Sequence, residues 1–249
     1  MKSLLLLLGL VSLTAARPAL DHPNIIIVFL DDSGFADFSH TGHPSIKTPN
    51  LTRLVREGAN FPQFYSASPA CTASRYGLLT GRNPARSGLG KWVISPTDAK
   101  YIHPSEITLA EGLKSAGYAT AIFGKWHLGT PNTANSNTPD AFPLAHGFDR
   151  WLGTNVSHDY DPGANLIEAP STEDTPIAGY HLVTSNIAAN IPVGDSLNQT
   201  YTDAAVSFIR ENKDQPFAAR SDPTLGKPSI QVAAALDTWH PPFSFLIGP

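Results

Sequence analysis

The sequence predicts an α/β fold in which helices flank a central, mostly parallel sheet. The first observation is the continuous apolar and β-branched run in Pro23–Asp32, which suits a strand covered on both faces. The second is that further apolar runs alternate with segments of helical spacing, the pattern of βαβ units. The 249 residues, of which 41% are hydrophobic and 15% charged, are enough to build a large folded core.

Two helices are expected after this first strand. Thr48–Gly58 places Leu51, Leu54 and Val55 at helical spacing and ends at a glycine. Ala73–Gly81 opens with a serine ahead of apolar residues, which indicates a second helix.

The middle of the chain combines regular elements with a long polar stretch. Ser105–Gly129 predicts a helix, a stop at Gly117 and a short strand in Ala119–Phe123. Between about Thr130 and Thr200 the pattern dissolves into Pro, Asn, Thr and Gly with few periodic segments, which predicts functional loops rather than disorder.

The last part of the chain resumes the alternation of helix and strand. Tyr201–Asn212 has the apolar spacing of an amphipathic helix, and Pro228–Asp237 is expected to be another buried strand. Phe217–Lys227 looks inserted before that strand, because a helix-to-strand connection should be short, and Ala219–Ser229 carries loop signals.

The N-terminus predicts export. Residues 1–16 have the basic start, short apolar run and small-residue end of a signal peptide, and the apolar run is too short for stable membrane insertion. The net charge of −4 and pI of about 6.1 exclude general attraction to nucleic acid. We therefore expect a secretory-pathway protein, secreted or lysosomal. Three sequons are candidate glycosylation sites, at Asn50, Asn155 and Asn198.

Two carboxylates follow the first predicted strand. Asp31 and Asp32 lie where ligands bind in open α/β sheets, and paired carboxylates suit Ca²⁺ or Mg²⁺. The alternative is that one caps a turn and the other is solvated.

Two further strand ends carry cations and histidines. Lys125 and His127 follow the strand in Ala119–Phe123 and, being two residues apart, could face one pocket. His240 follows the last predicted strand, with prolines behind it. The alternatives are a solvated lysine and histidines that satisfy only local hydrogen bonds.

Cys71, the one cysteine of the chain, has Arg75 a helical turn away. If a helix starts there, its N-terminus and the guanidinium both favour a tetrahedral oxyanion. The alternatives are a buried free thiol or an intermolecular disulfide, and a surface salt bridge for the arginine. Together with the strand-end residues, the pattern predicts a metal-assisted, cation-lined pocket for a small oxyanion.

These segments resemble the sulfatase family. "CTASRYGLLTGR" is similar to the signature in which Cys-x-Pro/Ala-Ser-Arg precedes Leu-Thr-Gly-Arg, and "GYATAIFGKWHLG" is similar to the second signature. "PNIIIVFLDDSGFADFS" resembles the family's metal-binding first strand, and "HGFDRWLGTNVSHDYDP" is closest to the arylsulfatase A and N-acetylgalactosamine-6-sulfatase branch. The resemblance is dense from Asn24 to about Pro162. It implies an alkaline-phosphatase-like sandwich.

The resemblance also implies roles for individual residues. Cys71 would be oxidised to formylglycine by the formylglycine-generating enzyme during secretion, and would act as nucleophile and metal ligand. Asp31 and Asp32 would bind the metal, usually Ca²⁺. Arg75 and Lys125 would stabilise the aldehyde hydrate and the sulfate oxygens.

Three more residues match family positions. His127 would help the covalent intermediate to collapse, Ser157 would contact the sulfate, and His240 would contact it and protonate the leaving alcohol. Ser157 also belongs to the sequon of Asn155, and a glycan there would sit awkwardly in a pocket.

The implied function is hydrolysis of a sulfate ester, either a small molecule or a sulfated glycan. Residues 17–249 match only the N-terminal part of the family's catalytic domain, without its later metal ligands and smaller second domain, so we expect little or no activity from this chain alone. The alternatives are a phosphonate or phosphate monoester hydrolase of the same superfamily, and a secreted, non-catalytic protein that binds oxyanions.

Overall fold

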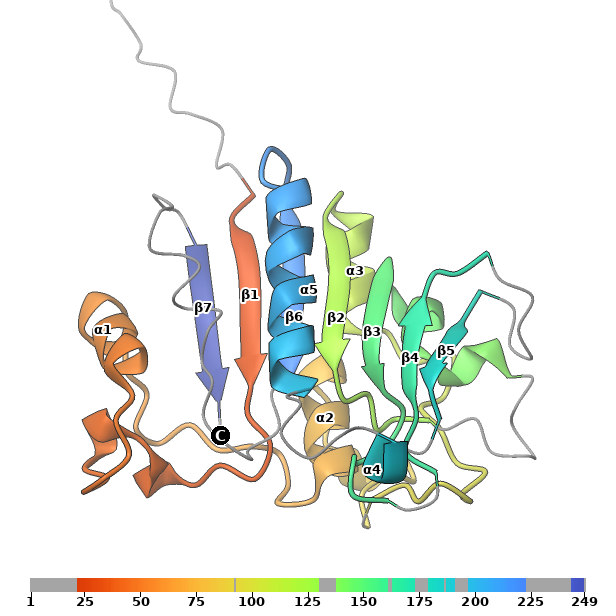
Figure 1. The fold of residues 1–249 in the computed structure, drawn as a ribbon, viewed down its shortest axis with the longest axis horizontal. Coiled ribbons are helices and arrows are strands. Elements are labelled where there is room, and N and C mark those ends of the chain that lie inside the picture. The colour runs from red at the N-terminus through yellow and green to blue at the C-terminus, as the bar shows by residue number, and fades with distance from the viewer. Residues whose placement is uncertain are drawn as a thin grey trace, which may run out of the picture.

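The structure is a computed structural model, which describes residues 22–91, 93–129, 138–160, 163–172, 179–185, 187–190, 197–222 and 243–248. These residues form one seven-stranded sheet in the order β5-β4-β3-β2-β6-β1-β7, with helices on both faces (Figure 1). The strands are β1 (Asn24–Phe29), β2 (Ala119–Gly124), β3 (Arg150–Thr154), β4 (Leu166–Ala169), β5 (His181–Thr184), β6 (Phe217–Asp222) and β7 (Phe243–Gly248).

The helices include all four that the sequence predicts. The α-helices are α1 (Pro49–Glu57), α2 (Cys71–Thr80), α3 (Leu109–Ser115), α4 (Ile187–Asn190) and α5 (Leu197–Glu211). The predicted four are α1, α2, α3 and α5. Short 3₁₀ helices cover Phe35–Asp37, Ser39–Thr41, Pro84–Arg86, Pro139–Ala141 and Pro143–His146. The expected stop at Gly117 is confirmed, since this glycine adopts a left-handed φ of 86° between α3 and β2.

The centre of the sheet is parallel, as predicted. β1 pairs with β6 and β7, and β2 pairs with β3 and β6, all in parallel. Only the β3–β4 and β4–β5 pairs in the described sheet are antiparallel. The carboxyl ends of β1, β2, β3 and β6 therefore meet at one edge, where ligands bind in α/β sheets.

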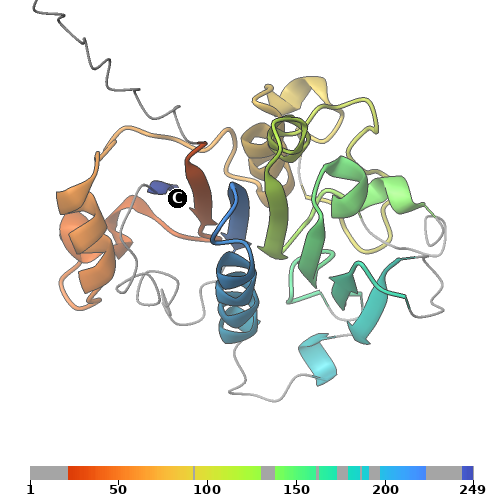
Figure 2. The same cartoon turned by 90° about the horizontal axis from the view of Figure 1, so that it is seen from above.

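Helices cover the two faces of the sheet with separate apolar clusters. α5 lies along one face, where Phe208 packs with Phe123 and Phe217. α2 and α3 lie on the opposite face (Figure 2). There Tyr76 belongs to a cluster with Trp126. Burial on both faces explains why β1 and β2 lack the polar alternation of a half-exposed strand.

The stretch between about Thr130 and Thr200, where functional loops are expected, also contains three strands that the sequence does not reveal, β3, β4 and β5. β3 contains Gly153, which lies so close to Gly124 that an added Cβ would be 1.7 Å from the Gly124 carbonyl oxygen. Short strands with glycine and charged residues give a weak periodic signal, and here pairing with β2 decides the structure.

The prediction that Phe217–Lys227 is an inserted loop is wrong for its first part, which is β6. The Asn24 side-chain oxygen accepts a hydrogen bond of 3.1 Å from the Phe217 N–H, which fixes the start of this strand beside β1. The connection from α5 is short, as expected. The predicted strand Pro228–Asp237 lies outside the described residues.

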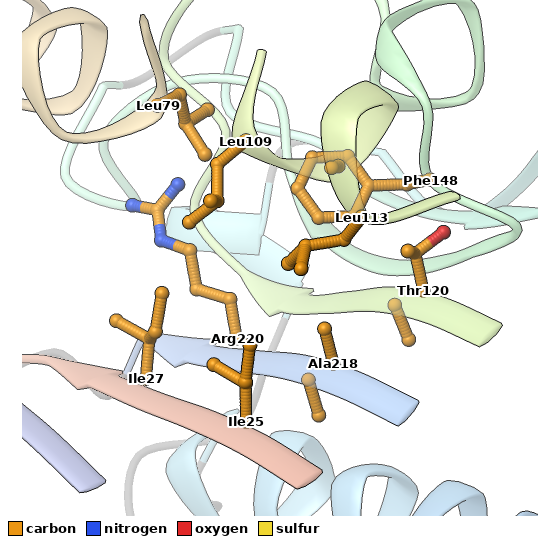
Figure 3. Close-up of a pocket in the computed structure, with 12 residues that line it drawn as sticks. Ile25, Ile27, Leu79, Leu109, Leu113, Thr120, Phe148, Ala218 and Arg220 are labelled. Carbon is orange, nitrogen blue, oxygen red and sulfur yellow. The ribbon is translucent and has the colours of Figure 1, made fainter. Parts of the chain in front are cut away.

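The sequence does not indicate a central strand at β6 because this strand contains a buried arginine, Arg220. Its side chain extends from β6 into a mainly apolar cavity, among Ile27, Leu79 and Leu109 (Figure 3). It is 2% exposed, and its guanidinium lies 5.4 Å from the centre of the Phe29 ring. A buried arginine in a strand hides the apolar pattern on which strand prediction depends.

Candidate functional site

The topology brings the predicted site residues to one edge of the sheet. Asp31 follows β1, Lys125 follows β2, and Ser157 follows β3. The helix α2 starts with Cys71, whose Sγ lies 3.4 Å from Asp31 Oδ1. Residues far apart in the sequence thus converge because parallel strands end at a common edge.

Asp31 is the centre of a buried ionic cluster. Lys125 Nζ donates a hydrogen bond of 2.8 Å to Asp31 Oδ2, and Arg75 Nη2 lies 3.4 Å from Oδ1. Arg75 Nη1 also donates to the Lys125 carbonyl oxygen at 2.8 Å. Arg75 is fully buried and Lys125 is 1% exposed. These three side chains carry one net positive charge, which suits an anion.

Electrostatics keep Asp31 ionised. Burial alone would raise the pKa of this carboxyl, but Arg75 and Lys125 outweigh burial and hold the pKa well below its usual range. Burial lowers the pKa of Arg75, although Asp31 opposes this effect. Each buried charge is therefore stabilised by an opposite charge, as buried ions require.

Cys71 occupies an anion-favouring position with a partly exposed thiol. It is the first residue of α2, and no side chain caps the N-terminus of this helix. Free N–H groups at a helix start attract negative charge. Burial, however, raises the pKa of the Cys71 thiol, against the effect of Lys125. The unmodified residue is thus a neutral thiol rather than a reactive thiolate.

His127 is held in one orientation behind the cluster. Its Nε2 donates a 2.7 Å hydrogen bond to the Ile94 carbonyl oxygen, and its backbone has a left-handed φ of 56°. Thr72 donates to the His127 carbonyl oxygen at 2.9 Å and so ties this loop to α2. Nδ1 is buried without a partner among the described residues, which leaves it as an acceptor. Burial, then the charges of Lys125 and Arg75, lower the pKa of His127 to about 3.

Ser157 joins the cluster, and the Asn155 side chain of the same sequon is buried. Lys125 Nζ donates to Ser157 Oγ at 3.0 Å. The side chain of Asn155 is 1% exposed, donates to the Gly163 carbonyl and accepts from the Asn165 N–H. This burial argues against a glycan at Asn155 in the folded chain.

Of the other two sequons, Asn50 is the more accessible. Asn198 is 7% exposed in the first turn of α5, which also argues against a glycan. Asn50 is partly exposed in the first turn of α1 and remains the candidate glycosylation site.

The predicted metal site is incomplete in the described residues. Asp31 contacts Cys71, but both of its carboxylate oxygens already face cations. Asp32 is exposed, with a left-handed φ of 52°. No group of three histidine, cysteine, aspartate or glutamate side chains converges in the part of the chain that the structure describes. Ca²⁺ takes six to eight oxygen ligands, so these residues alone do not fit it.

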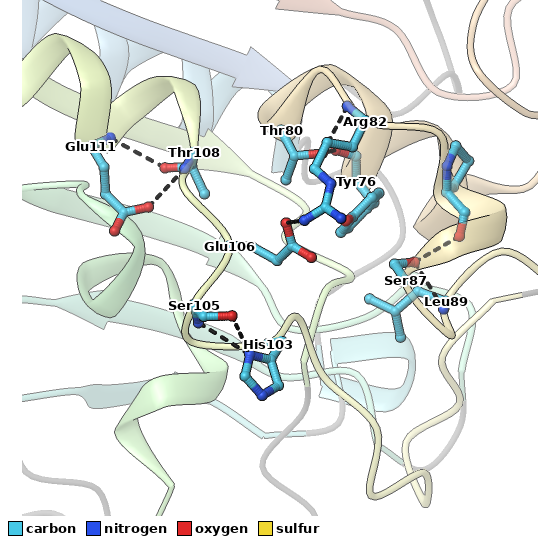
Figure 4. A network of polar contacts seen from close by, with 11 residues as sticks. Tyr76, Thr80, Arg82, Ser87, Leu89, His103, Ser105, Glu106, Thr108 and Glu111 are labelled. Atoms are coloured by element: carbon cyan, nitrogen blue, oxygen red, sulfur yellow. Dashed lines mark hydrogen bonds and ion pairs between the residues drawn. The ribbon is translucent and has the colours of Figure 1, made fainter.

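A polar network that the sequence analysis missed holds the other end of α2. Arg82, just beyond the helix, forms an ion pair with Glu106, which precedes α3 (Figure 4). Thr108 and Glu111 then cap α3 reciprocally. The link fixes α2 relative to α3 and therefore helps to place Cys71. The capping-box spacing Thr108-x-x-Glu111 was the available signal for the start of α3, whereas nothing in the sequence pairs Arg82 with Glu106.

His240 lies outside the described residues. Among the residues that are described, no helix has both the length and the apolarity to cross a membrane.

Comparisons with known proteins agree on one family. Residues 23–219 match the family model described as Sulfatase. The chain is 42% identical to bovine arylsulfatase A over 241 residues, which cover 94% of this chain and 44% of that protein. It is 39% identical to human N-acetylgalactosamine-6-sulfatase over 206 residues, 78% of this chain and 38% of that protein. The chain thus spans less than half of the curated relatives it matches.

Solved structures agree on the fold. One, described under the metabolism of multiple glycosaminoglycans by Bacteroides thetaiotaomicron, superposes with a TM-score of 0.66 at 29% identity over 85% of this chain and 52% of that chain. A phosphonate monoester hydrolase of Agrobacterium radiobacter superposes with a TM-score of 0.52 at 16% identity over 83% of this chain and 41% of that chain, a likeness of fold alone.

Proposed function

The chain belongs to the sulfatase family, and from this premise we propose that it carries the catalytic half-site of a sulfuric ester hydrolase. The main support for this proposal is that Cys71 Sγ lies 3.4 Å from Asp31 Oδ1, next to the buried side chains of Arg75 and Lys125. An oxyanion placed at the start of α2 would meet both cations and the helix N-terminus. The substrate would be a sulfate monoester, of either a small molecule or a sulfated glycan.

The proposed nucleophile is a formylglycine derived from Cys71 in the secretory pathway by the formylglycine-generating enzyme. Its aldehyde, when hydrated, supplies one hydroxyl to attack sulfur and a second to release sulfate. The position suits this group because the side chain is partly exposed and starts a helix. The raised pKa of the thiol supports the need for conversion, since an unmodified Cys71 is a poor nucleophile.

The surrounding residues of this chain would bind the sulfate and move protons. Arg75 and Lys125 would neutralise the sulfate oxygens as charge shifts during transfer. Ser157 holds Lys125 Nζ in place and would donate to a sulfate oxygen. His127 stays neutral at physiological pH, so its buried Nδ1 would accept a hydrogen bond from the hydroxyl that loses its proton as sulfate leaves.

Three finer parts of the proposal depend on residues that the structure does not describe. Ca²⁺ or Mg²⁺ at Asp31 and Asp32 would need further oxygen ligands, and we assign it no step. His240 as the proton donor to the leaving alcohol follows from the family resemblance alone. Secretion or lysosomal delivery likewise rests on the signal peptide in residues 1–16.

Phosphonate or phosphate ester hydrolysis is the weaker candidate. The similarity to a phosphonate monoester hydrolase is confined to the fold, whereas the sequence relatives are sulfatases. A secreted oxyanion-binding protein without catalysis would retain the cations but not the modification.

The mass of the tryptic peptide Glu57–Arg75 tests the proposal. The protein is secreted from cells that contain the formylglycine-generating enzyme, and the peptide is compared with that of the Cys71→Ala variant. The expected result is the mass loss that accompanies conversion of a thiol to an aldehyde. A peptide that retains an intact thiol in every molecule would contradict the catalytic proposal and support the binding protein.

A further inference from the structure

Tyr160 lies at the border of the site, in the turn after β3. Its N–H donates a 3.2 Å hydrogen bond to the carbonyl of Ser157, whose hydroxyl accepts from Lys125. Its ring meets the His127 ring edge-on, with centroids 6.2 Å apart and planes at 74°. Tyr160 thus contacts two residues of the proposed sulfate site, Ser157 through its backbone and His127 through its ring, without belonging to the ionic cluster.

The core fixes the position of this ring. Tyr160 packs against the apolar cluster that contains Val156 and Ala164, and its carbonyl accepts from the Ala164 N–H at 3.2 Å. The residue is nevertheless partly exposed. A ring held by packing and still open to solvent is preorganised, so it loses little conformational freedom when a ligand stacks on it.

The hydroxyl of Tyr160 stays neutral. Burial raises its pKa, and the negative charges of Asp159, Cys71 when ionised, and Asp98 add to this effect. The neighbouring loop is closely packed, because a Cβ on Gly163 would lie 2.4 Å from Pro96. The ring therefore presents an uncharged π face beside a cationic pocket, which suits an apolar group attached to an anion.

We propose that Tyr160 forms the leaving-group wall of the site and stacks against the ring of an aryl or pyranose sulfate. This inference rests on the proposed sulfate-ester function. A ring alcohol offers a flat face of C–H or π surface to Tyr160 while its sulfate reaches Arg75 and Lys125. A short linear alcohol lacks that face and would bind through the sulfate alone. Stacking of this kind corresponds to about a three- to tenfold gain in affinity.

Calorimetric titration of the 249-residue protein tests this assignment. The ligands are 4-nitrophenyl sulfate, galactose 6-sulfate, ethyl sulfate and inorganic sulfate. Comparing them separates the contribution of an aryl or sugar ring to the affinity from that of the sulfate group, which all four share. The variants are Tyr160→Ala, Tyr160→Leu and Tyr160→Phe. Leu182→Ala, on the exposed strand β5, is the control for a surface truncation.

We expect Tyr160→Ala and Tyr160→Leu to weaken binding of at least one ring sulfate about three- to tenfold and to leave ethyl and inorganic sulfate unchanged. Tyr160→Phe should bind like the wild type, since it keeps the ring. Equal weakening of all four ligands, or of none, would overturn the role of Tyr160. Failure of the wild-type protein to bind any of the four would instead overturn the proposed function itself.

Discussion

Two buried arginines lie close to the ring of Phe29, and their surroundings differ. Arg75 Nη2 is 3.4 Å from Asp31, and its guanidinium is 5.6 Å from the Phe29 ring centre. Arg220 approaches the same ring at 5.4 Å but extends into the mainly apolar cavity beneath α3. Burial lowers the pKa of both; Asp31 opposes this effect at both, and Arg75 adds to it at Arg220. Arg75 thus forms a close ion pair with the site's carboxylate, while Arg220 is placed among apolar side chains and feels the positive charge of Arg75.

The largest expected effect comes from removing the shared carboxylate. Asp31→Asn would leave Arg75 and Lys125 buried without their negative partner, which should destabilise the fold by about 4 kcal/mol. Urea unfolding measures this change. Glu57→Gln, which affects the exposed pair with Arg53 on α1, is the control for loss of a carboxylate and should cost less than about 1 kcal/mol. Equal losses in both variants would mean that the cluster is not specially dependent on Asp31.

The second-largest expected effect is a pH dependence of the free energy of unfolding that comes from His127. The folded protein keeps His127 neutral to a pKa of about 3, whereas the unfolded chain takes up a proton below about pH 6.5. The contribution of His127 to the free energy of unfolding is therefore fully present above pH 6.5. It is lost as the pH falls, and the loss reaches about 3 kcal/mol at pH 4.

The free energy of unfolding measured from pH 7 to pH 4 checks this prediction. His127→Gln should flatten the slope, and His103→Gln, at an exposed position, should leave it unchanged. An unaltered slope in His127→Gln would show that another group titrates there.

Arg220→Met sharpens the comparison between the two arginines. Replacing Arg220 by an apolar side chain of similar length removes a positive charge near Arg75 and leaves both ion pairs of Asp31 intact. Arg75→Met removes one of those ion pairs, so it should lower the free energy of unfolding more than Arg220→Met does. Urea unfolding of the two variants measures the difference, and equal losses would remove the distinction between the arginines.

The smallest effect concerns the ion pair beyond α2. Arg82 is 55% exposed in its pair with Glu106, so Arg82→Met should cost only about 0.5 to 1 kcal/mol. Thermal unfolding measures it. A loss as large as that of Asp31→Asn would place the main anchor of α2 here rather than at the site.

The sequence predicted the central fold and the convergence of the site for a physical reason. Buried parallel strands have distinct apolar runs, and their ends must meet at one edge, which brings Asp31 and Lys125 together. Ser157 was expected from the family resemblance alone, because the short strand β3 before it gives a weak signal. The sequence could not predict β6, because Arg220 interrupts the apolar pattern. Nor could it place Tyr160 against His127, since that contact depends on the turn after β3 and not on spacing.

Sulfate binding by wild type and Lys125→Met tests the central claim most directly, which is that the strand-end cations form an oxyanion site. Lys114→Met, a lysine that is half-exposed on α3, is the matched control. Calorimetry with inorganic sulfate should show binding by the wild type and by Lys114→Met, and at least about tenfold weaker binding by a folded Lys125→Met variant, which lacks a charge-assisted hydrogen bond. Equal sulfate affinity in all three proteins would contradict the account.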